Sequence, residues 1–460
     1  MEPLAAWVER EYRHAAAAIL RSVSPLDILK RRPGFGQTIH PQRGAIVASP
    51  VLAAYDPDPD YFFHWYRDSA VVVDALGLLF ERAQAARDAP ASPGSEGAGL
   101  LGHFADFVRF SLALARLDGR ALVAAPEWRS KVREDFRQFV RSDAELAAVH
   151  GDAVPAETRV NADGTLDISK WGRPQHDGPP LRALAVLRWM QRTALDGELG
   201  AAASTLLRAD LAFTLHHARV PCFDIWEEEL GLHYYTLCVS AAALEQGARW
   251  LDEHGERAAA HGCATEAESI YSMLDGYWLE QQGYYRSRVL PSGERSSKEL
   301  DIAVVLAAIH ALGGRTSHSS RDPRVHATLA HLAALFDRDY AINRERGAQR
   351  APALGRYAGD VYYSGGAYYF STLGAAELCF RAAASATEGS AASAFLQRGD
   401  AFLETVRAFT PPSGDLAEQF DRNTGEQTSA KHLAWSYAGF ISAVAARQLA
   451  SELIVRSASR

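Results

Sequence analysis

The apolar positions of this chain follow the spacing of amphipathic helices over most of its length. Apolar residues recur every three or four positions through long segments, as expected when one face of a helix is buried. This spacing predicts helices over 4–22, 69–86, 100–117, 179–195, 200–218, 235–254, 263–280, 299–312, 325–338, 368–385, 392–408 and 432–454. Strict alternation is scarce, and GAIVASPVL at 44–52 is the main candidate for a strand.

Similar loop segments recur at regular intervals between these helices. Connections rich in aromatic, acidic, Gly and Pro residues lie at 53–68, 161–180, 219–234, 352–368 and 411–431, about one for each pair of helices. Loops at one end of helical hairpins arranged around an axis can build a site together. No repeat or domain linker stands out, so the sequence predicts one all-α domain over residues 1–460.

Composition excludes several classes of protein. The 460 residues are 48% hydrophobic and 23% charged, which is typical of a globular protein with a large core. The net charge of -8 and the lack of a basic run argue against nucleic acid as a partner. The longest apolar segments are interrupted by charges, so neither a signal peptide nor a membrane span is expected.

The four cysteines are scattered in apolar surroundings without CxxC spacing: Cys222, Cys238, Cys263 and Cys379. Buried thiols are therefore favoured over a disulfide framework or a zinc site. A reducing compartment suits such thiols best, and the expected location is the cytoplasm, although a trimmed secreted precursor stays open as an alternative.

Two carboxylates in aromatic surroundings are the candidates for catalysis. CFDIWEEELG at 222–231 places Glu227 and Glu228 directly after Trp226, and DLAEQFDRN at 415–423 contains Glu418. Acidic residues at a helix start would be a simpler explanation for the first cluster. A glycosidase needs one protonated and one ionised carboxyl group. The apolar neighbour Trp226 and the like charge of Glu228 favour a proton on Glu227, and the polar surroundings of Glu418 favour its ionised form.

Three further loops carry side chains suited to binding sugars, namely rings for stacking and ion pairs for hydroxyl groups. They are YFFHWYRDSA at 61–70 with Tyr61, Trp65, Arg67 and Asp68, KWGRPQHDGPP at 170–180 with Trp171 and Arg173, and GRYAGDVYYSGG at 355–366 with Arg356 and Asp360. A simple salt bridge at a helix start is the alternative for Arg67 and Asp68.

Metal chemistry has little support in the sequence. DRNTGE at 421–426 and DPDPD at 56–60 hint at calcium loops, but the first has its Gly at the fifth position and the second has none. Turn or capping roles are favoured for both. The 16 histidines include no HExxH pair, and no P-loop, GxSxG or dinucleotide-binding motif occurs. No metal and no cofactor is expected.

Taken in order, these stretches resemble glycoside hydrolase family 15, the glucoamylases and their relatives. The resemblance runs through GAIVASPV, DPDYFFHWYRDSA, WGRPQHDGPPLRA, DIWEEELGLHYYTL, GRYAGDVYYSGG and EQFDRNTGEQTSAKHLAWSYAGF, and so covers nearly the whole chain. It implies an (α/α)6 barrel of six inner and six outer helices, with the pocket at one end. This agrees with the predicted helices and with the regular recurrence of the loops between them.

The resemblance also implies roles for individual residues. Glu227 matches the general acid and Glu418 the general base that activates water, with inversion at the anomeric carbon. The matching positions make Arg67 and Asp68 the residues that hold the terminal glucose, beside the walls Tyr61, Trp65, Trp226 and Trp435. Trp171 would support the acid, Glu228 and Arg356 would meet the next sugar, and Ser429 and Asp360 would support the site from behind.

Two departures from the family pattern concern the leaving part of the substrate. Fungal members carry Asn-Pro-Trp where this chain has Gly366, Ala367 and Tyr368, and Tyr234 and Tyr235 replace a phenylalanine pair. Neither a starch-binding module nor an N-terminal β-sandwich is found within residues 1–460, so soluble oligosaccharides are the expected substrates.

The leading hypothesis is an inverting, exo-acting α-glucosidase that releases glucose from the non-reducing ends of α-1,4-linked malto-oligosaccharides. One alternative keeps the fold and mechanism but acts on α-1,6 linkages, as in isomaltose or dextran, or on trehalose. A non-catalytic carbohydrate-binding toroid is the remote alternative. The oligomeric state is left open by the sequence.

Overall fold

The structure is a computed structural model that describes residues 2–55, 57–85, 96–125 and 127–458. The chain divides into two compact units, each assembled from separate stretches of sequence. Unit 1 comprises Met1–Ile19, Gly231–Glu245 and Ala264–Arg460, and unit 2 comprises Leu20–Leu230 and Gln246–Cys263. A single domain over residues 1–460 stays a prediction.

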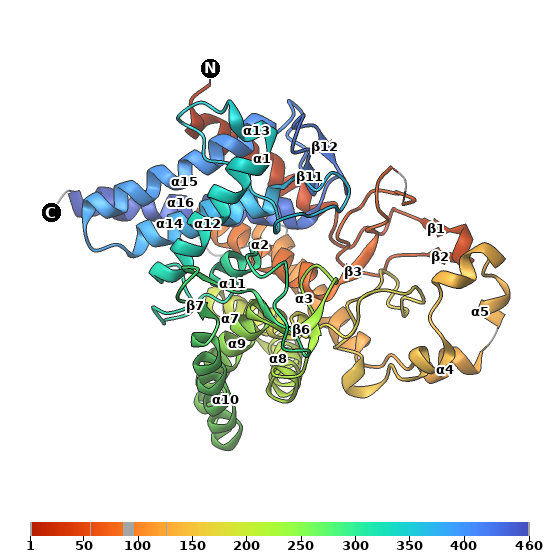
Figure 1. Cartoon of the computed structure of the whole chain (residues 1–460). Helices are drawn as coiled ribbons and strands as arrows, with labels where there is room; N and C mark the ends of the chain where they lie inside the picture. Colours follow the sequence, from red (N-terminus) through yellow and green to blue (C-terminus); the bar gives the residue numbers. More distant parts are fainter. Residues whose placement is uncertain (1, 56, 86–95, 126, 459–460) are drawn as a thin grey trace. The chain divides into compact units, whose positions relative to one another are not determined.

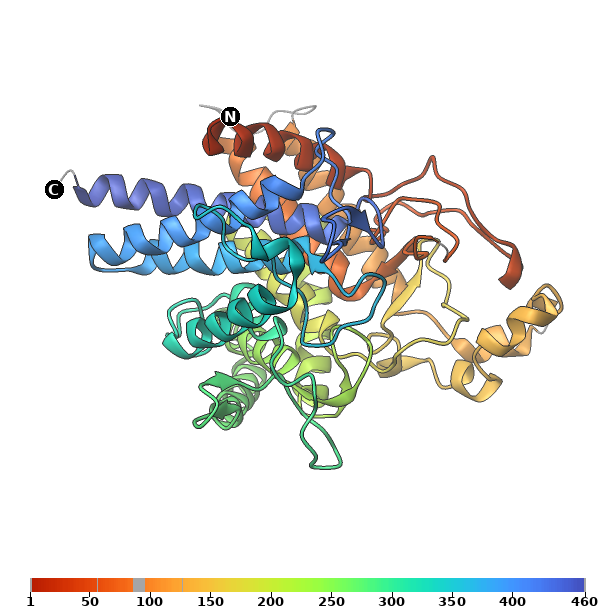
Figure 2. The same cartoon turned by 45° about the horizontal axis from the view of Figure 1, so that its top comes forward.

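Unit 1 is built around α14, which is buried along most of its length. Its helices are α1 (Leu4–Leu20), α11 (Ala303–His310), α12 (Pro323–Asp339), α13 (Ala341–Arg344), α14 (Tyr369–Ser385), α15 (Gly389–Phe409) and α16 (Ala434–Ala458). Helix α14 packs against α11, α15 and α16, and Figures 1 and 2 show α14, α15 and α16 lying side by side in blue. Residues 369–380 are buried on every side of the helix, and exposure begins only in its last turns, as expected where apolar or small residues occupy all faces.

Helix α16 is apolar enough to resemble a membrane span. By length and composition alone, Ala434–Ser457 could cross a membrane, with a mean hydropathy of 1.3. In unit 1 this helix packs against α14 and α15. Its residues Phe440 and Ile441 are completely buried there, whereas Leu449 and Val455 toward the end of the helix are exposed.

Short antiparallel strands connect the helices of unit 1. The strands are β6 (Leu230–His233), β7 (Trp278–Leu279), β8 (Tyr284–Tyr285), β9 (Arg288–Val289), β10 (Ala367–Tyr368), β11 (Gln419–Phe420) and β12 (Gln427–Thr428). Leu232 and His233 of β6 pair with β9, β7 pairs with β8, and β10, β11 and β12 form one small sheet. Helices α9 (Tyr234–Glu253) and α10 (Arg257–Asp275) contribute residues to both units.

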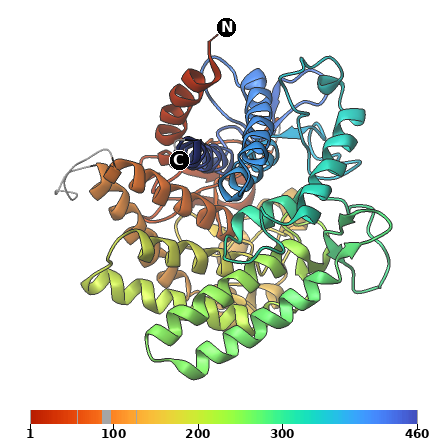
Figure 3. The same ribbon diagram turned by 90° about the vertical axis from the view of Figure 1, so that its left-hand side faces the viewer.

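Unit 2 has a core of four long helices, α2 (Tyr66–Ala85), α3 (Glu96–Leu114), α7 (Gly178–Arg192) and α8 (Gly197–His217). Helix α2 packs against α3 and α7, and α8 packs against α3 and α7; Figure 3 shows these helices side by side, in orange and yellow-green. At their centre the buried Trp189 stacks on Phe104 with ring centroids 4.6 Å apart. The Trp189 indole N–H donates to the carbonyl of Val73 at 2.9 Å, so its polar atom is satisfied in the core.

The rest of unit 2 consists of short elements. They are β1 (Lys30–Arg32), η1 (Pro33–Phe35), β2 (Gln37–Ile39), β3 (Phe63–Trp65), α4 (Gly119–Ala124), α5 (Glu127–Ser130), η2 (Glu134–Phe139), α6 (Asp143–Ala147), η3 (Gly151–Ala153), β4 (Arg159–Asn161) and β5 (Cys222–Phe223). Strands β3 and β4 pair antiparallel, and Trp65 lies opposite Arg159. This pair brings two segments that are distant in sequence to one place.

The structure confirms most of the helical predictions and corrects the predicted strand. Each predicted helical segment overlaps a helix, although 263–280 was placed too late and ends in β7. The prediction of a strand at 44–52 is wrong, since this run makes only an isolated bridge between Val23 and Ile46. Residues 44–49 are buried, and the Ala48 N–H donates to the carbonyl of Phe63 at 3.0 Å and not to a partner strand of this run.

Candidate functional site

The Trp-Glu-Glu-Glu stretch forms a tight turn in unit 2 and not the start of a helix. The backbone N–H of Glu227 donates to the carbonyl of Asp224 at 2.9 Å. The buried carboxylate of Asp224 accepts the N–H groups of Glu228 at 2.7 Å and Glu229 at 3.2 Å. The following helix α9 begins only at Tyr234. The helix-start explanation for this acidic cluster is therefore wrong, because Asp224 holds it in a turn.

Glu227 itself adopts a left-handed backbone conformation, with φ of 59°. For a residue other than Gly, Asn or Asp this conformation costs roughly 1–2 kcal/mol. The turn also lies close to Gly172, where an added Cβ would come within 2.6 Å of the Glu227 carbonyl oxygen. The local backbone is thus strained and tightly packed at the predicted acid.

The carboxylate of Glu227 is held at one oxygen by two donors. Oε1 accepts from the Arg67 guanidinium Nη2 at 2.7 Å and from the Trp65 indole N–H at 3.2 Å. Trp65 is the last residue of β3, and Arg67 lies in the first turn of α2. Because these two residues are only two positions apart, both side chains can reach Glu227. The structure therefore brings three of the predicted site residues together.

Arg67 is surrounded by three carboxyl groups. Besides Glu227, its Nη1 pairs with Asp177 at 3.1 Å, and its Nε lies 3.6 Å from Asp68. Burial would lower the pKa of Arg67, but Asp177, Glu227 and Asp68 raise it well above its usual value. Arg67 and Asp68 do form an ion pair at a helix start, as the alternative explanation held, but both are buried and Arg67 extends to the acid.

Three carboxylates around one guanidinium leave an excess of negative charge. Burial, partly opposed by Arg67 and reinforced by Glu227 and Asp177, raises the pKa of Asp68 to about 6. Burial likewise raises the pKa of Asp177, against the opposing effect of Arg67. A proton shared within this cluster at mildly acidic pH would relieve the repulsion.

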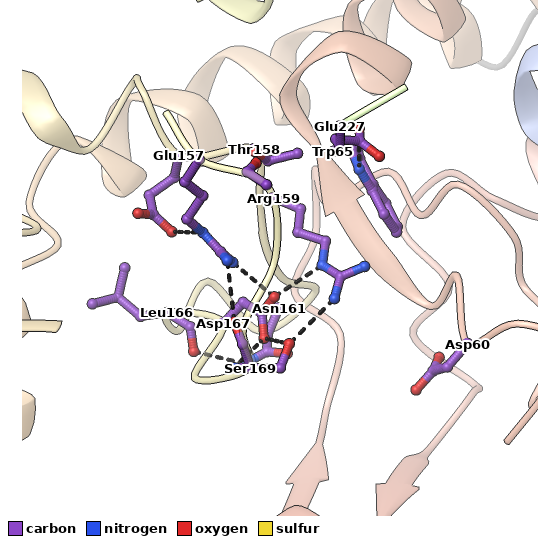
Figure 4. A network of polar contacts seen from close by, with 12 residues as sticks. Asp60, Trp65, Glu157, Thr158, Arg159, Asn161, Leu166, Asp167, Ser169 and Glu227 are labelled. Atoms are coloured by element: carbon purple, nitrogen blue, oxygen red, sulfur yellow. Dashed lines mark hydrogen bonds and ion pairs between the residues drawn. The ribbon is translucent and has the colours of Figure 1, made fainter. Parts of the chain in front are cut away.

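Aromatic rings line the same region of unit 2. The Tyr61 and Trp65 rings lie 5.1 Å apart, and Trp65 meets Trp171 edge to face at 6.3 Å. Trp171 is half-buried, and Trp226 is buried with 8% of its surface exposed. The guanidinium of Arg159 lies 3.7 Å from the Trp171 ring centre and 4.6 Å from that of Trp65. Figure 4 shows Arg159 between Trp65 and the polar residues Asp167 and Ser169.

In unit 1, Glu418 precedes β11 and is held by Ser429. The Ser429 hydroxyl donates a short hydrogen bond to Oε2 of Glu418, and the Glu418 N–H donates to the Ala430 carbonyl at 2.7 Å. Glu418 is buried, with 8% exposed. Ser429 has a left-handed backbone, with φ of 64°. The predicted contact between Ser429 and Glu418 is thus present.

Arg356 and Asp360 form a buried, two-pronged ion pair in unit 1. The Arg356 Nε and Nη2 atoms lie 2.7 Å and 2.6 Å from the two Asp360 oxygens. The Tyr368 hydroxyl donates to Asp360 at 3.3 Å and accepts from the Gln419 amide at 2.8 Å. Since Gln419 directly follows Glu418, hydrogen bonds connect the Arg356 pair to the backbone that carries the predicted base.

Trp435 and the residues that depart from the family pattern are packed inside unit 1. Trp435 stacks on Phe370 at 4.5 Å. Tyr234 and Tyr235 are buried, with their hydroxyl groups 2.9 Å and 2.7 Å from Nδ1 of His318 and His310, respectively.

Gly366, Ala367 and Tyr368 are also buried, the last two as β10. The expectation that these departures lie where the leaving sugar binds stays a prediction.

Three contributors to this site are not among the residues predicted from the sequence. Asp177 stands immediately before the GPP start of α7, and its position at a helix start among site motifs was the available signal. Asp224 could have been suspected as a turn residue. Nothing in the sequence singled out Arg159. Of the rejected calcium loops, 421–426 is a turn in which Asp421 accepts the N–H groups of Asn423 and Thr424, and Asp56 of the other lies outside the described residues.

Comparison with known proteins decides the family. A model described as Glycosyl hydrolases family 15 matches residues 155–445, more than half of the chain. The chain belongs to glycosyl hydrolase family 15.

Individual relatives agree with this family. A glucoamylase from Neurospora crassa is 28% identical over 88% of this chain, which spans 63% of that relative's length. The intracellular sporulation-specific glucoamylase of Saccharomyces cerevisiae is 25% identical over 88% of this chain and 79% of its own. A solved family 15 glucoamylase from Hypocrea jecorina matches with a TM-score of 0.77 and 25% identity, over 97% of this chain and 72% of that one.

These comparisons confirm two of the predictions and leave a third untested. The family is the predicted one, with its class of glycoside hydrolases, and the solved relatives are (α/α)6 barrels, the predicted fold class. The roles of individual residues are not addressed by the comparisons, and these stay predictions.

Proposed function

We propose that this family 15 chain is an inverting, exo-acting α-glucoside hydrolase. It would release β-D-glucose from the non-reducing ends of α-1,4-linked malto-oligosaccharides. The observation that carries the proposal is the arrangement around Glu227, whose Oε1 accepts hydrogen bonds from both Arg67 and Trp65. A group fixed in this way can present its second oxygen to a substrate in one orientation.

Glu227 is proposed as the general acid. Both donors occupy Oε1, so Oε2 is the oxygen assigned to carry the proton to the leaving glycosidic oxygen. The hydrogen bonds from Arg67 and Trp65 fix the orientation of this carboxyl group, so Oε2 points in one direction.

Glu418 is proposed as the general base. The hydrogen bond from Ser429 to Oε2 stabilises the ionised carboxylate, and an ionised carboxylate can remove a proton from water. Inverting enzymes keep their two carboxyl groups about 6.5–9.5 Å apart, so that a water molecule fits between base and sugar.

The remaining site residues are proposed to bind sugars. Arg67 and Asp68 would hold the hydroxyl groups of the terminal glucose, with Tyr61 and Trp65 as walls of the first subsite and Trp226 as a further substrate-binding residue. Trp171 would support the acid, and Trp435 would form a wall on the side of the base. Glu228 and Arg356 would meet the next sugar, with Asp360 fixing the guanidinium of Arg356. Neither proton transfer requires a cofactor, because the two glutamates perform both.

The anomer of the released sugar tests the mechanism. Hydrolysis of maltotriose followed by NMR should show β-glucose before mutarotation, whereas an initial α-anomer would contradict inversion. Glu418→Gln should lower kcat by at least ~10² if Glu418 is the base. Glu426→Gln, on the exposed part of the same loop, is the matched control and should keep normal turnover.

The linkage preference is tested with the same enzyme. Turnover on maltose, isomaltose and trehalose should favour maltose strongly. The departures that suggested another linkage are buried side chains, so no specific observation favours α-1,6 bonds or trehalose. A chain without turnover on any of the three would support the remote alternative, a carbohydrate-binding toroid.

We also propose a cytoplasmic location. All four cysteines are free thiols and are buried, and burial raises the pKa of Cys238 to about 12. Such thiols are suited to a reducing compartment. Cell fractionation would test this, and recovery of the chain in the extracellular medium would refute it.

A further inference from the structure

A buried arginine faces three aromatic rings next to the predicted acid. The Arg159 guanidinium carbon lies 4.0 Å from the ring centre of Phe63, 4.6 Å from that of Trp65 and 3.7 Å from that of Trp171. Only 1% of Arg159 is exposed. Rings at these distances stabilise a cation through their electron-rich faces, and the effect is largest where water is excluded.

The other side of the guanidinium is fixed by polar partners. Arg159 Nε donates to Asp167 at 2.9 Å and Nη2 donates to Ser169 at 3.2 Å, as Figure 4 shows. Its Nη1 has no hydrogen-bond partner within the described part of the chain. Burial would raise the pKa of Asp167, but Arg159 and Arg173 hold it well below its usual range.

A chain of contacts leads from this cation to the reacting group. Arg159 and Trp65 lie opposite each other in the β3–β4 pair, and the Trp65 indole N–H donates to Oε1 of Glu227 at 3.2 Å. A cation held near the indole face withdraws electron density from the ring. This makes the N–H a stronger donor, and packing restricts the orientation of the ring.

We propose that Arg159 is a positioning residue for the acid, an inference that rests on the proposed function of Glu227. Arg159 acts through Trp65: it fixes the indole and strengthens the hydrogen bond that orients the Glu227 carboxyl group. It touches neither the sugar nor the leaving oxygen. Loss of Arg159 therefore impairs protonation of the leaving group more than it impairs binding or water attack.

Two substrates with different leaving groups test this directly. Maltose needs a proton on its departing oxygen, whereas fluoride leaves from α-D-glucosyl fluoride with little protonation. Arg159→Met should lower kcat on maltose about tenfold, equivalent to about 1.4 kcal/mol. Its kcat on the fluoride should fall less than about threefold, because the acid contributes little to that step.

Arg141→Met is a matched control. Arg141 is also buried, and it pairs with Glu157 at 2.9 Å and 3.0 Å in the same polar network. In Arg141→Met, Glu157 keeps its ion pair with Arg173, and in Arg159→Met, Asp167 keeps its ion pair with the same Arg173. Each variant therefore removes one of the two arginines paired with a buried carboxylate. Arg141→Met should keep the ratio of the two kcat values at the wild-type value.

Two further variants keep the test decisive if Arg159→Met does not fold. Arg159→Lys retains the charge without the planar group and should lose part of the kcat on maltose alone. Trp65→Phe retains a ring but lacks the N–H, and it should give the same preference for the fluoride. When added to Trp65→Phe, Arg159→Lys should lower kcat on maltose by less than half of the free-energy effect that it has in the wild type. The reason is that Trp65→Phe already lacks the hydrogen bond to Glu227.

Three results would overturn the inference. They are equal losses of kcat on both substrates in Arg159→Met, the same selective loss of kcat on maltose in Arg141→Met, and additive losses of kcat in the double variant. Normal kcat on maltose in Arg159→Met would overturn it as well. A wild-type protein that releases glucose from neither substrate would overturn the proposed function itself, whereas these other results require an active wild type.

Discussion

The buried carboxyl group of Glu11 makes stability depend on pH in a predictable direction. Glu11 lies on α1 with 2% of its surface exposed. Burial, opposed by Arg10 and reinforced by Asp415, raises its pKa from 4.5 to about 7. The folded chain therefore keeps a proton that the unfolded chain releases near pH 4.5. The stabilisation is complete below pH 4.5 and is lost as the pH rises to about 7 and above.

The size of this effect follows from the shift. Each unit of pKa corresponds to about 1.4 kcal/mol, so ionisation of Glu11 should cost roughly 3 kcal/mol of unfolding free energy at pH 8. Glu11→Gln keeps the shape of the neutral acid. We expect this variant to match the wild type near pH 4.5 and to exceed its unfolding free energy by roughly 3 kcal/mol at pH 8.

Urea unfolding followed by tryptophan fluorescence at pH 4.5 and pH 8 measures this difference, provided that each transition is two-state. Glu452→Gln is the control, since Glu452 is exposed on α16 and pairs only loosely with Arg456 at 3.4 Å. Its effect should be small and nearly independent of pH. A pH-independent difference for Glu11→Gln, or a larger one at pH 4.5, would refute the reasoning.

Three further predictions concern the proposed site. Ser429→Ala removes the donor to Glu418, which makes ionisation of the base harder, so the acidic limb of kcat/KM on maltotriose should move up by about one pH unit. Gly172→Ala would press a Cβ against the Glu227 carbonyl, and kcat should fall at least ~10-fold with the helical circular dichroism unchanged. Arg67→Lys keeps the charge but loses the planar guanidinium that donates to Glu227, and kcat/KM should fall at least ~10²-fold. Normal activity of Gly172→Ala would exclude the proposed role of the close contact at Gly172, and normal activity of Arg67→Lys would exclude that of the hydrogen bond from Arg67 to Glu227.

The helices of this protein were predictable because their apolar stripes are regular. Helix α10 was the least well placed: its first turns, RAAAHGCATEA, are small residues with little contrast between apolar and polar positions. The run at 44–52 looked like a strand because its residues are apolar and β-branched. Burial of residues 44–49 accounts for the apolar composition without a partner strand.

The site was predictable where residues lie close together in the sequence. Glu227 and Glu418 stood out through their aromatic neighbours and through the family resemblance. The contacts of Arg159 could not be predicted, since its rings come from positions 63, 65 and 171 and meet it only after β3 and β4 pair. The Asp177 partner of Arg67 belongs to the same class of contact, formed between distant segments by folding.

The left-handed backbone at Glu227 also bears on how this chain can change over evolutionary time. Glycine or asparagine would occupy that conformation at lower energy, so mutation alone would tend to replace the glutamate with a residue that makes the fold more stable. Glutamate at this position therefore costs the fold some stability in return for a reactive group. Replacing Glu227 by glycine or asparagine should make the fold more stable and remove that group.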